Sequence, residues 1–180
     1  TSNWGGFLEC SCGKVAFQGQ TCADIGGRTN HTGGKAMLAM DTDGDGDRDL
    51  LFTEESCVNL YRMENLGTTD VPVMNNLQPF HLGNSVVMQH YPSPYYLDVD
   101  QDGVKDLLIG LNITSRTSSF NDFASSLWRY RNTGSTGSPV FVLEQFNFLQ
   151  DEMIEVGDFS APAFADLDRD GDLDLIVGTF

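Results

Sequence analysis

The sequence predicts an all-β fold made of repeated four-stranded units. Its 180 residues include 19 Gly, 6 Pro and long Ser/Thr/Asn-rich stretches. Few windows show a sustained 3.6-residue apolar period, which indicates short strands joined by turns. An aspartate-rich pattern also recurs three times, and the apolar segments around it recur with it. Such self-similarity is typical of a repeated structural unit.

The composition indicates a folded and strongly acidic protein. The formal net charge is −16, with 40% hydrophobic and 11% aromatic residues, which excludes intrinsic disorder. We expect neither nucleic acid nor an anionic membrane as a partner without a compensating cation. No apolar run approaches the roughly 20 residues of a spanning helix, so we expect no direct membrane insertion. Residues 1–6 do not resemble a signal peptide, and we expect any such sequence to have been removed.

Each copy of the pattern reads DxDxDGxxD and runs into aliphatic residues. The copies start at Asp41, Asp98 and Asp166, a spacing of roughly 60 residues that suits a four-stranded sheet with long loops. Each copy follows an expected strand and precedes another. The expected strands before the loops are 36–40, 95–97 and 163–165, and those after them are 50–52, 107–109 and 175–177.

A second segment repeats further along the chain. Residues 60–67 match residues 127–134: both alternate large apolar with polar side chains and end in Asn-x-Gly. This alternation fits a half-buried strand, and Asn-x-Gly supplies a turn. Pro72-Val73 and Pro139-Val140-Phe141 follow and predict the next strand. Each full repeat therefore offers four strands.

The clustered aspartates need a countercharge, because four or five of them within nine residues repel strongly. We number the motif from its first Asp. Positions 1, 3 and 5 can point inward around one centre, Gly at position 6 permits a sharp turn, position 7 can offer its carbonyl, and position 9 adds a carboxylate. Six or more hard oxygen ligands suit Ca²⁺ better than Mg²⁺. Val104 at position 7 is consistent with a backbone ligand.

Two other metal-site classes fit less well. An EF-hand shares the DxDxDG opening but needs Glu at position 12 and flanking helices, whereas position 12 here is Phe52, Ile109 or Val177. The loops contain neither Cys nor His, which disfavours zinc and copper. A solvated acidic turn without metal is the remaining alternative, and three copies in one register argue against it.

The loop, its flanking strands and the Asn-x-Gly strand resemble the VCBS/FG-GAP repeats of integrin-α-like β-propellers, over residues 35–180. The resemblance implies an all-β propeller segment of four-stranded antiparallel blades, incomplete as given, with one Ca²⁺ in each loop. It implies that Asp47, Val104 and Asp172 contribute their carbonyls. The remaining implied ligands are Asp41, Asp43, Asp45 and Asp49; Asp98, Asp100, Asp102 and Asp106; and Asp166, Asp168, Asp170 and Asp174.

Two further segments resemble large surface proteins exported by the bacterial type IX secretion system. They are the stretch from Cys10 through His31-Thr-Gly-Gly into the first loop, and Phe148 to Ile154 before the third. This resemblance implies a secreted or cell-surface location.

The repeats divide the chain into four parts. They are an N-terminal cysteine-containing segment (1–35), a first blade-like repeat (36–80), a second (81–150) and the first half of a third (151–180). Propellers close with about four to eight blades. We therefore expect a segment of a larger polypeptide, partnered by remaining blades or domains of the same chain. The alternative is a small open β-sheet arrangement that a partner chain completes.

The four cysteines, Cys10, Cys12, Cys22 and Cys57, indicate an oxidising compartment and up to two disulfides. Cys10 and Cys12 are too close in sequence to bridge comfortably, so we expect them to pair with Cys22 and Cys57. A zinc site built from all four is a weaker alternative, because a single Cys-x-Cys lacks a second paired motif.

We expect no catalytic site in this chain. The three His are isolated, and neither a nucleophile elbow nor a phosphate-binding loop occurs. The leading hypothesis is a secreted, calcium-stabilised module that binds protein or polysaccharide. The alternatives are a scaffold or accessory domain of a polysaccharide lyase or hydrolase, and a filament or adhesin component.

Overall fold

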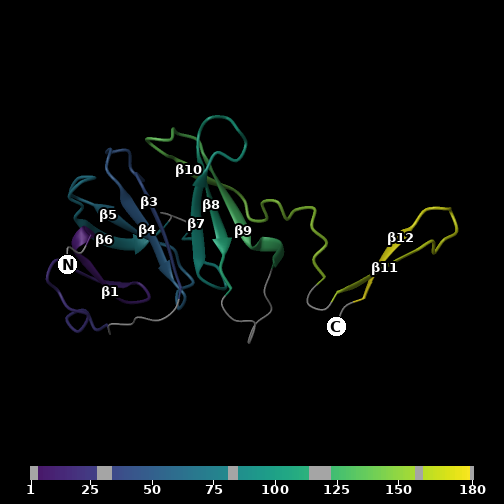
Figure 1. The fold of residues 1–180 in the computed structure, drawn as a ribbon, viewed down its shortest axis with the longest axis horizontal. Helices are drawn as coiled ribbons and strands as arrows, with labels where there is room; N and C mark the ends of the chain where they lie inside the picture. Colours follow the sequence, from purple (N-terminus) through teal and green to yellow (C-terminus); the bar gives the residue numbers. More distant parts are fainter. Residues whose placement is uncertain (1–3, 28–33, 81–84, 114–122, 157–159, 179–180) are drawn as a thin grey trace.

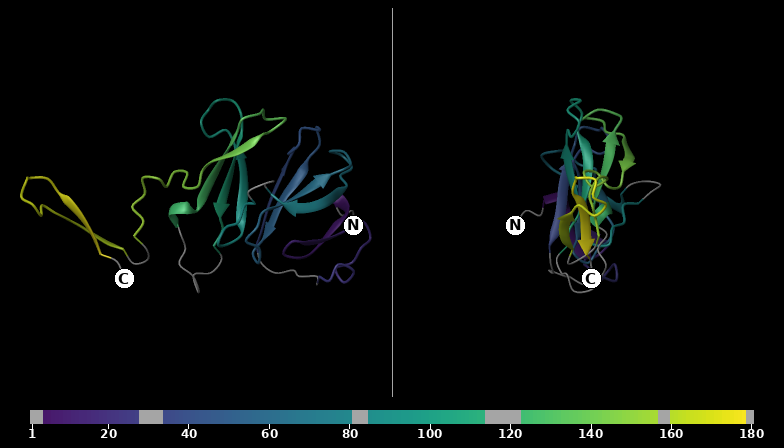
Figure 2. Two further views of the ribbon diagram at one scale, coloured as in Figure 1. Left: turned by 180° about the vertical axis from the view of Figure 1, so that it is seen from behind. Right: turned by 90° about the vertical axis from the view of Figure 1, so that its right-hand side faces the viewer.

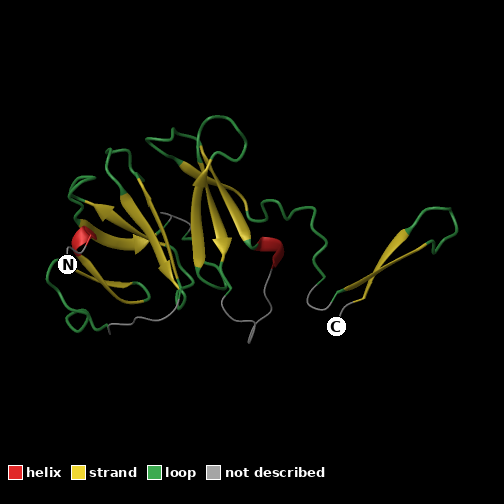
Figure 3. Cartoon of the chain, viewed as in Figure 1, coloured by secondary structure: helices red, strands yellow, loops and turns green. Residues whose placement is uncertain are grey.

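The computed structural model describes residues 4–27, 34–80, 85–113, 123–156 and 160–178. Within these ranges the regular structure is β apart from two short 3-10 segments, η1 (Trp4–Gly6) and η2 (Phe123–Ser125) (Figure 3). The prediction of a nearly all-β fold is confirmed. No helix in the described part of the chain has the length and apolar character needed to span a membrane. His31 and Phe180 lie outside the described residues.

Two four-stranded antiparallel sheets form the body of the molecule. The first sheet contains β3 (Lys35–Met40), β4 (Asp49–Glu54), β5 (Tyr61–Asn65) and β6 (Met74–Pro79), paired in that order. The second contains β7 (Pro92–Leu97), β8 (Asp106–Leu111), β9 (Leu127–Asn132) and β10 (Phe141–Gln145), also paired in chain order. The four strands expected for each of these repeats are therefore present.

The two sheets pack face to face and share one core (Figure 1). Leu51 of β4 meets Leu107 and Ile109 of β8 in this core, and all three side chains are buried. Alternate residues of a strand point to opposite faces. Leu50 and Phe52 consequently face the other way, into a second core. Strand β4 is buried along its whole length because both of its faces are covered.

An N-terminal hairpin covers the outer face of the first sheet. It consists of β1 (Phe7–Ser11) and β2 (Lys14–Phe17), and it was not predicted from the sequence. Val15 of the hairpin packs with Leu50, Met63 and Met74. The first sheet therefore lies between the hairpin and the second sheet.

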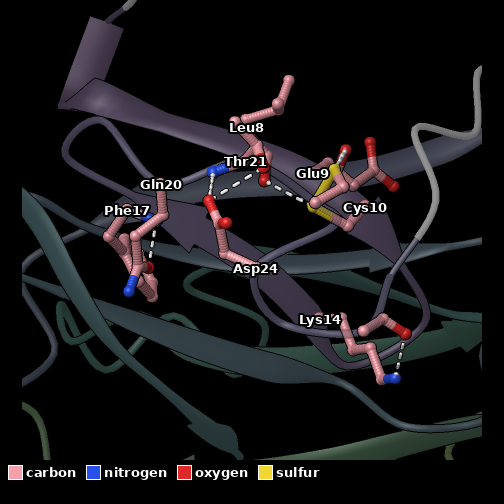
Figure 4. The surroundings of a disulfide bond; sticks show 10 residues. Leu8, Glu9, Cys10, Lys14, Phe17, Gln20, Thr21 and Asp24 are labelled. Atoms are coloured by element: carbon pink, nitrogen blue, oxygen red, sulfur yellow. Dashed lines mark hydrogen bonds between the residues drawn. A yellow bond between two sulfur atoms is a disulfide. The ribbon is translucent and has the colours of Figure 1, made fainter.

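Two disulfides fix this hairpin. Cys10 is bonded to Cys22, and Cys12 is bonded to Cys57. The predicted pairing of Cys10 and Cys12 with the two later cysteines is confirmed. Around the first bond, the backbone N–H and hydroxyl of Thr21 both donate to Asp24 (Figure 4). The second bond joins the hairpin to the segment that follows β4, so it links the two layers covalently.

A second hairpin, β11 (Ala161–Ala165) and β12 (Asp174–Gly178), stands apart from both sheets (Figure 2). It corresponds to the expected half repeat. Its apolar side chains are poorly covered: Phe164 is 66% exposed and Leu175 is 42% exposed.

Two neighbouring glutamates, one partly and one fully buried, lie between the N-terminal hairpin and the first sheet. Glu9 of β1 forms an ion pair with Lys35, whose Nζ is 3.9 Å from Oε2 of Glu54. Oε1 of Glu9 and Oε2 of Glu54 are buried without a hydrogen-bond partner in the described structure. Burial raises the pKa of Glu9, and the neighbouring Glu54 raises it further.

Removing the disulfide that closes the longer loop should destabilise the chain more, because the loop-closure entropy grows with the logarithm of loop length. The Cys12–Cys57 bond spans 45 residues and the Cys10–Cys22 bond spans 12. Loop-closure entropy predicts losses of about 4 and about 3 kcal/mol for the paired Cys→Ala variants. Urea unfolding measures both free energies. A smaller loss on removing Cys12–Cys57 would contradict the entropic ranking.

Glu9 should make stability depend on pH. Its folded pKa lies above the ordinary 4.5, so the folded state retains a proton that the unfolded state has released. This contribution to stability is therefore lost as pH rises from about 4.5 through the folded pKa. Glu9→Gln should flatten that part of the profile in chelator-treated protein, followed by urea unfolding. The exposed Glu152→Gln variant is the control, and an equal effect of both would refute the assignment.

Candidate metal centres

The three aspartate loops occupy the same place in three strand pairs. Each joins the first two strands of its unit, and position 9 is the first residue of the second strand. The closing pairs are Met40 with Asp49, Leu97 with Asp106, and Ala165 with Asp174. The predicted strand–loop–strand arrangement is thus confirmed in all three copies.

The loops share their internal hydrogen bonds. The backbone N–H of position 6 donates to Oδ2 of position 1 in each loop: Gly46 to Asp41 at 3.0 Å, Gly103 to Asp98 at 3.0 Å, and Gly171 to Asp166 at 3.2 Å. These glycines have φ between 89° and 99°, a region that disfavours side chains. Glycine at position 6 is therefore required by the backbone of the loop.

Each loop gathers three carboxylates around one point. One oxygen from each lies within 4.8 Å of the others, so each group is able to hold a metal ion. The groups are Asp41, Asp43 and Asp45; Asp98, Asp100 and Asp102; and Asp166, Asp168 and Asp174. In the third loop Asp174 takes part and Asp170 does not.

In the first two loops, the environment of the position 9 carboxylate differs from that of the three grouped carboxylates. Asp49 and Asp106 are almost fully buried. Oδ1 of each accepts the backbone N–H of an asparagine at the end of the third strand, Asn65 or Asn132, at 2.9 Å. These two aspartates therefore tie the loop to the third strand and lie outside the groups of three.

Two arginines that the sequence analysis did not single out contact these carboxylates. Nη2 of Arg62 donates to Asp43 at 2.6 Å and to Asp49 at 3.0 Å. Nη2 of Arg129 donates to the carboxylates at the same motif positions of the second loop. The available signal was their shared place in the matched segments 60–67 and 127–134.

The asparagines of the Asn-x-Gly turns have a structural role. Oδ1 of Asn132 accepts the backbone N–H groups of Gly134 at 3.0 Å and Val140 at 2.9 Å. Asn65 makes the equivalent pair of bonds in the first sheet. This side chain holds the turn between the third and fourth strands, because its oxygen satisfies two backbone donors at once.

Position 7 lies outside all three groups. The backbone N–H groups of Asp47, Val104 and Asp172 donate to the position 5 carboxylates at 2.8 to 3.1 Å. The backbone carbonyls of these residues remain predicted ligands.

Electrostatics differ among the loop carboxylates. Burial, reinforced by the neighbouring aspartates, raises the pKa of Asp47, and its Oδ1 is buried without a hydrogen-bond partner. The hydrogen bond from Arg129 lowers the pKa of Asp100. A carboxylate oxygen without a hydrogen-bond partner beside a group of three other carboxylates suits a hard cation, because all the potential metal ligands are oxygen atoms.

Comparison with known families agrees with this geometry. A family model described as an FG-GAP-like repeat matches residues 41–109 and, again, residues 98–177. Both matches begin at the first aspartate of a loop and end in the strand after the next loop. Searches of curated proteins and of solved structures gave no match. Since the two family matches together span well over half of the sequence, the chain belongs to the FG-GAP-like repeat family.

Proposed function

We propose that this chain is a calcium-stabilised β-propeller module of a secreted or cell-surface protein. The observation that carries the proposal is a group of three carboxylates at each of three equivalent strand junctions. Bound Ca²⁺ would remove the repulsion among these carboxylates, which amounts to about 1 kcal/mol per pair at 4 Å in water and more where water is excluded. Asp41, Asp98 and Asp166 would anchor one ion each.

The packing of successive units supports the propeller. The residue after position 9 faces the preceding layer in both sheets: Leu50 packs on the N-terminal hairpin and Leu107 packs on the first sheet. The equivalent Leu175 in the third unit is partly exposed. On the second sheet, Tyr95 and Val142 are each about half exposed. In the proposed propeller, these surfaces face neighbouring blades of the same larger chain.

The disulfides support an extracellular location. Such bonds persist in oxidising compartments, and FG-GAP-like repeats together with disulfides are typical of extracellular proteins. Export through the type IX system is proposed from the resemblance of Phe148 to Ile154 and of the stretch beginning at Cys10. Secretion of an epitope-tagged parent protein into the medium or onto the cell surface tests the location.

Protein or polysaccharide binding by the outer surface is the activity that we propose. The first two loops lie along the same edge of the molecule (Figure 1). Gly44 of the first loop approaches Ser138, in the turn of the second sheet, so closely that an added Cβ would lie 2.6 Å from Oγ. Loops held in this way form a fixed edge suited to recognition, and screens against surface proteins and polysaccharides test it. A substrate screen distinguishes this activity from the alternative role beside a polysaccharide lyase or hydrolase.

Chelation should lower the melting temperature of the chain. Each site held at 100 times its Kd contributes about 2.7 kcal/mol. For a chain of this size the loss corresponds to roughly 5–10 °C per site. Thermal scans with and without chelator measure the shift, and elemental analysis should find about one Ca²⁺ per loop. Absence of bound calcium together with an unchanged melting temperature would refute the proposal.

Substitutions in the second loop should separate side-chain ligands from backbone ligands. Asp102→Ala removes a carboxylate from the group of three and should weaken the second site at least tenfold, since a charged ligand is lost. Val104→Ala should leave affinity nearly unchanged, because position 7 would act through its carbonyl. Calcium titration followed by calorimetry measures both. Equal losses would show that the assignment of position 7 is wrong.

A further inference from the structure

The first two loops each receive one arginine from the third strand of their own sheet. Arg62 lies opposite Leu51 and Arg129 lies opposite Leu108, which are equivalent places in the two registers. Both guanidinium groups reach the carboxylates at motif positions 3 and 9. A contact made twice by the same motif positions belongs to the repeat and is not a single surface ion pair.

Of the two arginines, Arg129 makes the larger set of contacts. Its Nη2 lies 2.5 Å from Oδ2 of Asp100 and 2.7 Å from Oδ2 of Asp106, and its Nε donates to the same Asp106 oxygen at 3.1 Å. Nη1 lies 3.2 Å from Glu144, and the ring of Phe148 stacks 5.5 Å from the guanidinium carbon. The side chain is only 12% exposed, so the cation is held in place on several sides.

Arg129 matters for stability because its partner Asp106 is a buried charge. Asp106 is 2% exposed, with one oxygen bonded to a backbone N–H and the other to Arg129. Removing the partner of a buried charge is strongly destabilising, because the remaining charge is then uncompensated. Arg129 therefore stabilises the second sheet whether or not a metal is present.

The third loop lacks the strand that supplies these arginines. The third unit is described only as far as its second strand, β12, whereas Arg62 and Arg129 lie on the third strands β5 and β9. The observations that carry the role of the arginines are therefore those of the first two loops.

We propose that Arg62 and Arg129 are resident countercations of the first two loops. They keep the position 3 and position 9 carboxylates neutralised in metal-free protein, and they lower the calcium affinity of these loops. The second effect follows because a fixed positive charge repels the incoming cation and retains two of the carboxylates that it would use. This inference rests on the proposed calcium binding.

The test compares the Arg129→Met and Arg131→Met variants of the 180-residue chain. Arg131 is the matched control: it carries the same charge, is 47% exposed and lies 3.9 Å from Asp100 and from Asp102. Thermal scans in chelator and in calcium give stability. The amide resonance of Gly103, which donates to Asp98 in this loop, reports calcium binding at the second site.

Arg129→Met should lower the melting temperature more in chelator than in calcium, because bound calcium replaces the missing charge. Its Gly103 resonance should reach half-shift at a calcium concentration roughly three- to tenfold lower than in the parent at low ionic strength. Arg131→Met should show a smaller change in both quantities. Arg129→Lys, which keeps the charge, should restore much of the metal-free stability.

Two results would overturn the inference while leaving calcium binding intact. One is an equal loss of melting temperature in chelator and in calcium, which would assign Arg129 to packing alone. The other is an unchanged or higher half-shift concentration at Gly103 in Arg129→Met. Absence of any calcium response at Gly103 in the parent chain would instead refute the proposed calcium site, and this inference with it. If Arg129→Met folds only when calcium is added, the inference is supported.

Discussion

Repulsion among closely spaced carboxylates at the strand junctions is the constraint on which the rest of the structure depends. Each unit places three or more aspartates in one tight loop, and each loop closes a strand pair in the same register. Backbone N–H groups that donate to the carboxylate oxygens, such as that of Gly103 to Asp98, offset part of this repulsion. Cations must offset the remainder.

The carboxylate at motif position 9 connects the loop to the third and fourth strands of the sheet. Asp106 bonds the backbone of Asn132, and the side chain of Asn132 then organises the next turn through Gly134 and Val140. Loop, third strand and fourth strand are thus connected by a short series of polar contacts, which begins with the buried bond between Asp106 and Asn132. Asp106 and Asn132 are both almost fully buried, and the exclusion of water there strengthens the bond between them.

Much of the fold and of the loops was predictable from the sequence, because both depend on local order. The repeat located the loops, and continuous apolar stretches located the strands on either side of Asp41 and Asp98. The contact of Arg62 with Asp49 was not predictable, since it joins strands through tertiary packing. The N-terminal hairpin was missed for a related reason: its short strands gain their stability by packing Val15 against the first sheet. Pairing partners of the cysteines were expected as a set, but which bonded with which required the fold.

The bond between Cys12 and Cys57 has a mechanical consequence for a chain that is pulled from its two ends. Tension would pass directly through the sulfur atoms and bypass residues 13–56. Strands β3 and β4 and the first aspartate loop lie within that bypassed stretch, whereas the loops at Asp98 and Asp166 lie in the path of the load. The first loop is therefore shielded from stretching, and the two later loops would bear force across their strand junctions.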